Sequence, residues 1–238
     1  MDNNINKRHA QLPNGMSGGG CSPKDQFIYL VIKMCDGDGG CYPSLETISR
    51  KSGYSVPVVR ECIRNLISAG YISMEHIGKK NYYYFNVCDG FEVFSPEFIE
   101  CDDLSPLAKS NIVAIQQHMF KGVRGYGKVS YSNRELAKLI NTNESNIRKS
   151  YRELERKGYL TLSPNLSRDP ETGCKLTTKI FHLGELGQSV IWALRSHEER
   201  LNKVDKDVDE LKKENQEMRK MLDALMRERD VEPEKYIM

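Results

Sequence analysis

Two stretches of the sequence place arginine and lysine at helical spacing, and both end in Gly-Tyr. Residues 60–72 read RECIRNLISAGYI, and residues 148–160 read RKSYRELERKGYL. The positions that are identical at an offset of 88 residues are Arg60/Arg148, Arg64/Arg152, Leu66/Leu154, Gly70/Gly158 and Tyr71/Tyr159. Guanidinium and ammonium groups bind phosphate, and one arginine can donate two hydrogen bonds to a guanine in the major groove. The chemistry that these residue types support is therefore recognition of nucleic acid.

In each copy a helical wheel separates an apolar stripe from a charged face. The two stripes consist of Val59, Cys62, Ile63 and Leu66, and of Ile147, Ser150, Tyr151 and Leu154. The two opposite faces carry Pro57, Arg60, Glu61, Arg64 and Ser68, and Ser145, Arg148, Lys149, Arg152 and Arg156. A stripe suited to a core opposite a basic face predicts that the charges point toward solvent or a polyanion.

Residues on the outward face of each basic helix are the candidates for reading bases. In the second copy, we expect the major groove to be contacted by Ser145, Arg148, Lys149 and Arg152. In the first copy Arg60 and Arg64 are the candidates, and Pro57 offers an apolar contact to a thymine methyl group. Arg156 and Lys157 lie nearer the helix end, where phosphate contact or plain solvation is expected. Any single charge also fits an ordinary solvated face, so the repetition is the stronger signal.

The elements that must position these helices follow the same order twice. Each copy opens with Ser-Pro, at Ser22-Pro23 and Ser105-Pro106, which predicts a capped helix start. The N-caps predicted for the three helices of each copy are Ser22, Ser44 and Ser55, and Ser105, Ser132 and Asn143. The glycine of each Gly-Tyr pair predicts the end of the basic helix. The resulting order is helix, short strand, helix, turn, helix, strand, loop, strand.

This order, with its residue pattern, resembles that of the winged helix-turn-helix modules of phage and plasmid replication proteins and bacterial regulators. The resemblance rests on CYPSLETISRKSGYSVPVVRECIRNLISAGYI at 41–72 and VSYSNRELAKLINTNESNIRKSYRELERKGYL at 129–160. It implies a helix-turn-helix with a β-hairpin wing in each copy, binding double-stranded DNA. Pro57 departs from the pattern, since such modules tend to have a polar or basic residue there.

The predicted hairpins also carry basic residues. YISMEH and YYYFNV flank residues 77–81, and YLTLS and KLTTKIFHL flank a longer loop that contains RDPETG. In a winged module these loops are placed to contact the DNA backbone or the minor groove. The candidates for this role are Lys79, Lys80, Arg168, Lys175 and Lys179. Ordinary loop charge is the alternative interpretation.

Charge is segregated along the 238 residues although the net charge is only +2. Residues 104–183 carry +8, residues 20–88 carry +2, and residues 89–103 carry −6. A localised basic surface favours a polyanionic partner, and the acidic segment should avoid DNA. Its phenylalanines predict that it packs between the modules.

The last part of the chain has a heptad pattern. Leu194, Leu201, Val208, Asn215 and Leu222 recur every seven residues, and so do Val190, His197, Val204, Leu211, Met218 and Leu225. Calling these positions a and d predicts a coiled coil, and asparagine at an a position favours a parallel, in-register dimer. The residues predicted to form the dimer seam are Leu194, Leu201, Val204, Val208, Leu211, Asn215, Met218, Leu222 and Leu225. A helix that packs on its own chain is the alternative.

The sequence thus predicts a mainly α fold of the α+β winged-helix class: two tandem modules followed by a long C-terminal coiled-coil helix. The expected segments are a flexible N-terminal arm (1–19), winged helix 1 (20–88), an acidic connector (89–103), winged helix 2 (104–183), a coiled-coil dimerisation helix (184–230) and a tail (231–238). Seven scattered cysteines without a CxxC pair give no support for a metal site, and Cys35 and Cys62 fit a reduced core.

Three functions compete. The first is a cytoplasmic homodimer that binds double-stranded DNA sequence-specifically. Its role would be replication initiation at an origin or transcription regulation, and its further partners would be replication or transcription proteins. The second is a protein-interaction scaffold that uses winged helices and coiled coil without reading DNA. The third, an enzyme, is not expected, because no phosphate-binding glycine loop, metal cluster or paired carboxylates stand out. No cofactor is expected. No membrane association is expected either, because no apolar run is long enough to span a bilayer.

Overall fold

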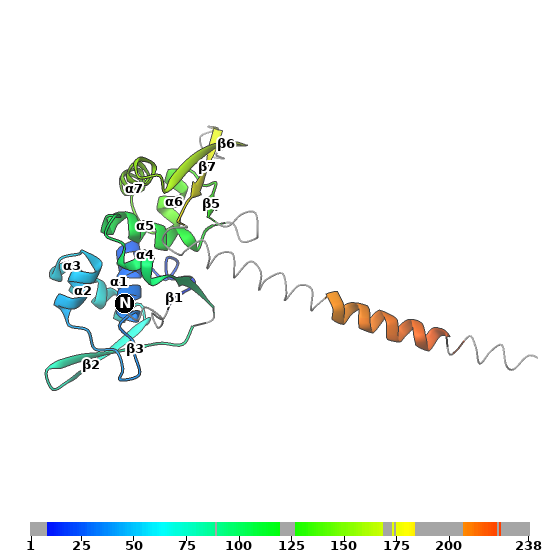
Figure 1. Cartoon of the computed structure of the whole chain (residues 1–238), viewed down its shortest axis with the longest axis horizontal. Coiled ribbons are helices and arrows are strands. Elements are labelled where there is room, and N and C mark those ends of the chain that lie inside the picture. Colours follow the sequence, from blue (N-terminus) through cyan, green and yellow to red (C-terminus); the bar gives the residue numbers. More distant parts are fainter. Residues whose placement is uncertain are drawn as a thin grey trace, which may run out of the picture. The chain divides into compact units, whose positions relative to one another are not determined.

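The computed structural model of the chain describes residues 9–88, 90–119, 127–168, 173, 175–183, 207–222 and 224. The chain divides into two compact units, Met1–Ala193 and Leu194–Met238. The first unit holds every element labelled in Figure 1, and the second holds a single described helix. Among the described residues no helix is both long and apolar enough to cross a membrane.

The first half of the larger unit is a helix-turn-helix with a β-hairpin wing (Figure 1). Its elements are α1 (Pro23–Lys33), α2 (Leu45–Ser52), α3 (Val56–Ser68), β2 (Ile72–Ile77) and β3 (Lys80–Phe85). The hairpin is antiparallel, and Cys41 forms an isolated bridge with Tyr83, which places the predicted short strand beside the wing. The element order predicted for this half is confirmed.

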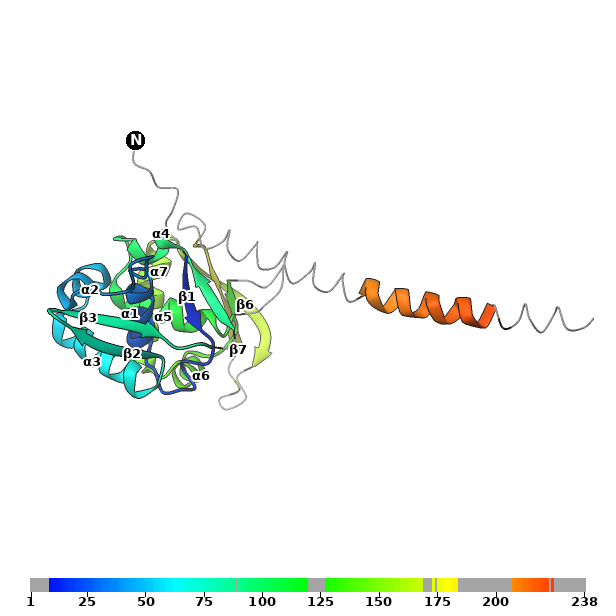
Figure 2. The same cartoon turned by 90° about the horizontal axis from the view of Figure 1, so that it is seen from below.

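The second half repeats that order with longer strands. Its elements are α5 (Pro106–Gln116), β5 (Lys128–Val129), α6 (Asn133–Leu139), α7 (Glu144–Arg156), β6 (Leu160–Arg168) and β7 (Lys175–Phe181). The three strands form one antiparallel sheet in the order β5-β7-β6. Figure 2 shows the long β6 and β7 beside this group of helices.

Side-chain caps explain where the helices begin. All six predicted N-cap residues occupy the N-cap position. Ser132 and Glu135 form the predicted capping box, and Ser22 with Asp25 forms another. Ser55 makes no capping hydrogen bond through its side chain, and Pro57 lies in the first turn of α3. A proline is tolerated there because the backbone N–H of that turn has no partner within the helix.

The repeated Gly-Tyr pair has a structural explanation. Gly70 and Gly158 have φ angles of 76° and 79°, in the left-handed region that glycine adopts without a steric penalty. The N–H of Tyr71 donates to the carbonyl of Leu66 at 3.0 Å, and that of Tyr159 donates to the carbonyl of Leu154 at 2.8 Å. These bonds form the Schellman motif, in which the glycine stops the helix and the next residue satisfies a free carbonyl.

The segment before α1 differs from the prediction of a flexible arm over 1–19. Residues Ala10–Pro13 form β1, which pairs with β4 (Phe91–Phe94) of the acidic connector. The side chains of Leu12 and Met16 are fully buried. Residues 10–19 therefore belong to the packed fold, because their apolar side chains find a partner strand about 80 residues later.

The acidic connector is also packed. It contains β4 and the short helix α4 (Pro96–Glu100), and its Phe94, Phe98 and Ile99 are buried. Phe94 and Phe98 therefore pack as predicted, whereas Phe91 is half-buried. The core that they join is continuous: one cluster of buried residues draws on α1, α3, α5 and α7, and α1 packs against α5. The two halves are therefore one folded unit.

The smaller unit contains a helix over residues 207–222. Val208, Leu211, Met218 and Leu222, which belong to the predicted seam, are all at least 40% exposed in this single chain. Leu194, Leu201, Val204 and Leu225 lie outside the described residues. The dimer stays a prediction.

Candidate nucleic-acid interface

The outward face of α7 gathers the four side chains predicted to read bases. Ser145, Arg148, Lys149 and Arg152 are all exposed, and together with Glu144 they line a hollow of about 270 Å³. The predicted stripe on the other side of the helix, from Ile147 to Leu154, is buried in the core. The sequence thus placed both faces of this helix correctly, because three- and four-residue spacings define a helix face without reference to tertiary contacts.

Glu144 is a member of this face that the sequence analysis did not single out. Its Oε1 accepts hydrogen bonds from Arg148 Nη2 at 2.5 Å and Nε at 3.0 Å. Both side chains are exposed, so the pair contributes at most about 1 kcal/mol. The carboxylate orients the guanidinium along α7, and Arg148 must exchange this partner to bind a phosphate or a base. The i,i+4 spacing of an acidic and a basic residue was the available signal.

The outward face of α3 has the predicted members but a weaker positive charge. Pro57, Arg60, Glu61 and Arg64 are exposed. A second carboxylate, Glu46 of α2, lies near this face: its own backbone, then Ser44, then the charge of Arg60 lower its pKa. Two carboxylates beside two arginines leave little net charge. The α3 face is therefore suited to shape-dependent contacts more than to phosphate neutralisation.

The first wing carries its lysines at the hairpin turn, as predicted. Lys79 and Lys80 are exposed. The ammonium of Lys80 lies 4.2 Å from the centre of the Tyr42 ring, and the rings of Tyr42 and Tyr82 are 5.2 Å apart. The cation–π contact ties Lys80 of the wing to Tyr42, before α2, without removing its charge.

The second wing differs from the prediction at one lysine. Arg168 and Lys175 are cross-strand partners in the β6–β7 ladder, and their side chains lie outside the described residues. Lys179 is only 5% exposed and its ammonium donates to the carbonyl of Tyr131. Burial lowers the pKa of Lys179. Lys179 is therefore an internal bridge to the segment before α6, and the prediction that it contacts DNA is wrong.

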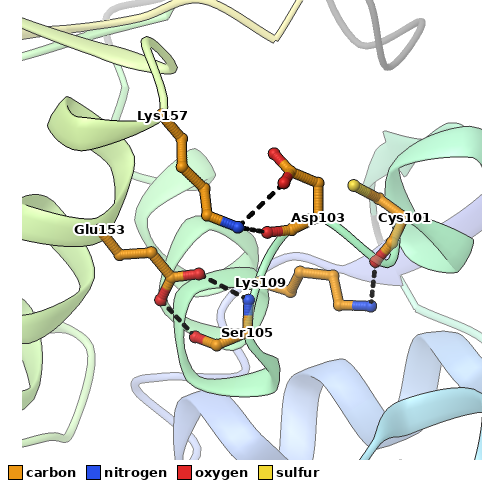
Figure 3. Close-up of polar contacts among 6 residues, drawn as sticks. All are labelled: Cys101, Asp103, Ser105, Lys109, Glu153 and Lys157. Carbon is orange, nitrogen blue, oxygen red and sulfur yellow. Dashed lines mark hydrogen bonds and ion pairs between the residues drawn. The ribbon is translucent and has the colours of Figure 1, made fainter.

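The C-terminal half of α7 is tied to the acidic connector and to the start of α5 (Figure 3). Lys157 Nζ pairs with Asp103 Oδ1 at 3.0 Å and donates to the carbonyl of the same residue. Glu153 accepts from the backbone N–H of Ser105 at 2.7 Å and from its hydroxyl at 2.5 Å. The expectation that Lys157 contacts phosphate or is plainly solvated is corrected, since a connector carboxylate pairs with it.

Lys109 of α5 also binds the acidic connector. Its side chain is buried, and its ammonium donates to the carbonyls of Ile99 at 3.0 Å and Cys101 at 2.9 Å. Burial lowers the pKa of Lys109, with Cys101 and Asp102 opposing that effect. The connector is therefore held from two helices, α5 and α7, and its negative charge is kept beside the end of α7 and away from Ser145.

Metal-ligating side chains and thiols are the other groups of interest among the described residues. No group of three or more His, Cys, Asp or Glu side chains among them could hold a metal ion. Burial raises the pKa of Cys21 and of Cys41 to about 12, which keeps both thiols protonated and unreactive. Cys62 is buried and Cys35 is partly buried, in keeping with their expected place in a reduced core.

Comparison with known proteins agrees with the first half of this description. Residues 21–72 match the family model described as "Helix-turn-helix domain", which spans α1, α2, α3 and the first residue of β2. No curated protein matches the chain. Residues 21–72 therefore form a helix-turn-helix domain, a fold that suggests DNA as its partner.

Proposed function

We propose that the protein binds double-stranded DNA sequence-specifically, with α7 as the principal helix in the major groove and α3 as a second one. The observation that carries the proposal is the exposed face of α7, where Ser145, Arg148, Lys149 and Arg152 surround one hollow. Residues 104–183 then form a second winged helix, which repeats the element order of the matched domain.

Charge favours this function over the alternative, a protein-interaction scaffold. Residues 104–183 carry +8, and the connector that would repel DNA is held at the far end of α7 by the pair between Lys157 and Asp103. A scaffold surface does not require a basic helix face, whereas phosphate neutralisation supplies most of the affinity for DNA. Binding of a replication origin and control of transcription are both compatible with this surface.

A homodimer is the second part of the proposal. The helix 207–222 exposes Val208, Leu211, Met218 and Leu222 at a and d positions of the heptad pattern. Apolar side chains at this spacing are covered by the partner helix in a parallel coiled coil. Such a dimer brings two copies of the DNA-binding unit to one DNA molecule and raises the apparent affinity through effective concentration.

The experiment that tests DNA binding removes two charges from α7. We expect Lys149→Ala with Arg152→Ala to weaken binding to a selected duplex by about 1–3 kcal/mol and to flatten the salt dependence by about one to two units. Fluorescence anisotropy at several salt concentrations measures both. The matched control is Lys213→Ala with Lys220→Ala, which removes the same charge from exposed positions of helix 207–222.

The control pair should retain wild-type binding. Equal losses of affinity in both variants would mean that only overall charge matters, and would contradict the assignment of α7 as the principal DNA-binding helix. Arg60→Ala with Arg64→Ala should cost less than the α7 pair, because Glu46 and Glu61 already offset these arginines.

A further inference from the structure

The two halves of the larger unit meet through reciprocal contacts. α1 packs against α5, and these are the first helices of the two repeats. In addition, the helix-turn-helix turn of each half lies against the start of the other half's first helix. An interface in which residue i meets j and the equivalent of j meets the equivalent of i is isologous, and isologous contacts define a two-fold axis.

The first of these turn contacts joins α2–α3 to α5. Gly53 has a φ of 74°, and a Cβ added there would lie 2.7 Å from Pro106 Cγ. The next residue, Tyr54, has its hydroxyl 2.9 Å from Ser110 Oγ. Only a glycine lets the turn approach Pro106 so closely.

The second contact joins α6–α7 to the start of α1. Asn141 stands 88 residues after Gly53 and is the only described non-glycine residue with a positive φ, of 56°. Its Nδ2 donates to the carbonyl of Gly20 at 2.9 Å, just before the Ser22-Pro23 start of α1. That start corresponds to Ser105-Pro106 of α5, so the two contacts join equivalent elements, although they use different residue pairs.

The two junctions are filled differently. At the first junction the Tyr54 ring occupies the space beside α5. At the second, the equivalent residue is Thr142, and a hollow of about 410 Å³ remains, lined in part by Pro23, Leu107 and Thr142. The two-fold relation therefore holds for the placement of the elements but not for their side chains.

We propose that one chain binds a DNA site made of two unlike half-sites in inverted orientation at one fixed spacing, with α3 on one half-site and α7 on the other. The proposal rests on the DNA-binding function proposed above. The reciprocal contacts relate α3 to α7 by an approximate two-fold operation, and duplex DNA has two-fold axes of its own. Two helices related in this way enter the major groove in equivalent fashion only on half-sites of opposite direction.

The half-sites differ because the two helices present different side chains. α7 offers Arg148, Lys149 and Arg152, while α3 offers Pro57 with Arg60 and Arg64. The spacing is fixed because a single core and the two turn contacts connect the halves. A dimer through the C-terminal helix would then bind two such inverted pairs.

The experiment uses the full wild-type chain, so no variant can fail to fold. Duplexes selected in vitro by the full chain define the two half-sites. Three duplexes are then compared by fluorescence anisotropy: the selected site, the same site with one half-site reversed in place, and the site with an insertion of about half a helical turn, or about 5 base pairs. Sedimentation of the complex gives the number of chains for each pair of half-sites.

We expect both altered duplexes to bind on the order of 10²-fold more weakly, since each loses one of two linked contacts. We also expect one chain for each pair of half-sites, whether the protein binds as a monomer on one pair or as a dimer on two pairs. Equal binding to the reversed site, or two chains for each pair, would overturn this inference and leave DNA binding intact. Failure to select any duplex would instead overturn the proposed function itself.

Discussion

At the level of single residues, basic side chains fall into two groups: those on the outer face of α7 are exposed, whereas Lys109 of α5 and Lys179 of β7 are buried. Helical spacing placed Arg148, Lys149 and Arg152 outward, as observed. Along a hairpin, by contrast, every lysine is equally plausible as a DNA contact. Lys179 points inward because its ammonium donates a hydrogen bond to the carbonyl of Tyr131, 48 residues away. No pattern local to the strand contains that partner.

The pair between Glu144 and Arg148 leads to a prediction about affinity. Glu144→Gln removes the carboxylate that holds Arg148 and eliminates one negative charge from the proposed DNA face. Affinity for duplex DNA should rise several-fold at low salt, with a smaller gain at high salt because charge interactions are screened there. Anisotropy titrations measure this. Glu155→Gln, an exposed residue farther along α7, is the matched control and should have the smaller effect.

The cysteines allow a direct test of burial. The pKa of Cys21 and of Cys41 is raised to about 12 by burial, so both remain thiols well above neutral pH. Cys88 is exposed. A thiol-alkylating reagent should therefore modify Cys88 within minutes and Cys21 and Cys41 only after denaturation, as read by peptide mass spectrometry. Rapid labelling of Cys41 in the native protein would contradict its burial and its hydrogen bond to the carbonyl of Ile32 in α1.

At the level of elements, local signals predicted most helix starts and ends. The caps and the Gly-Tyr ends involve residues within six positions of one another, so the sequence contains both partners. The packing of residues 10–19 was missed because β1 pairs with a strand about 80 residues later. The ties of Glu153 to the start of α5 and of Lys157 to the connector were missed for the same reason.

Substitutions at three glycines can separate the destabilisation caused by backbone strain in a turn from that caused by a clash at an interface. Gly53 and Gly70 have nearly the same φ, 74° and 76°, but only Gly53 faces a neighbouring atom, Pro106 Cγ. Gly70→Ala should lower the free energy of unfolding by about 1–2 kcal/mol through backbone strain alone. Gly53→Ala should cost clearly more, because the added Cβ also clashes with α5.

Chemical denaturation measures both variants. Gly37→Ala is the control, since Gly37 has neither a positive φ nor a neighbour within 4 Å of an added Cβ, and its effect should be near zero. If Gly53→Ala and Gly70→Ala were equally costly, the close contact between the first turn and α5 would not exist in solution.

At the level of the whole molecule, the two helix-turn-helix turns share one core, while the heptad helix forms a separate unit. In the proposed function, the larger unit supplies both DNA-reading helices, and the smaller unit supplies the association of chains. The larger unit would fix the spacing within one chain, and the helix would determine how many chains act together.

The heptad register can be tested with two apolar residues of one helix. Leu211 at d and Met221 at g are 56% and 66% exposed in the single chain, so aspartate at either position should leave the fold intact. Leu211→Asp buries a charge in the dimer seam, whereas Met221→Asp places it at the edge. We expect Leu211→Asp to convert the full chain to a monomer in sedimentation and Met221→Asp to leave a dimer. A monomeric DNA complex of Leu211→Asp should keep its half-site sequences and lose only the gain in affinity from linkage. A dimer that survives Leu211→Asp unchanged would show that the chains associate through another surface.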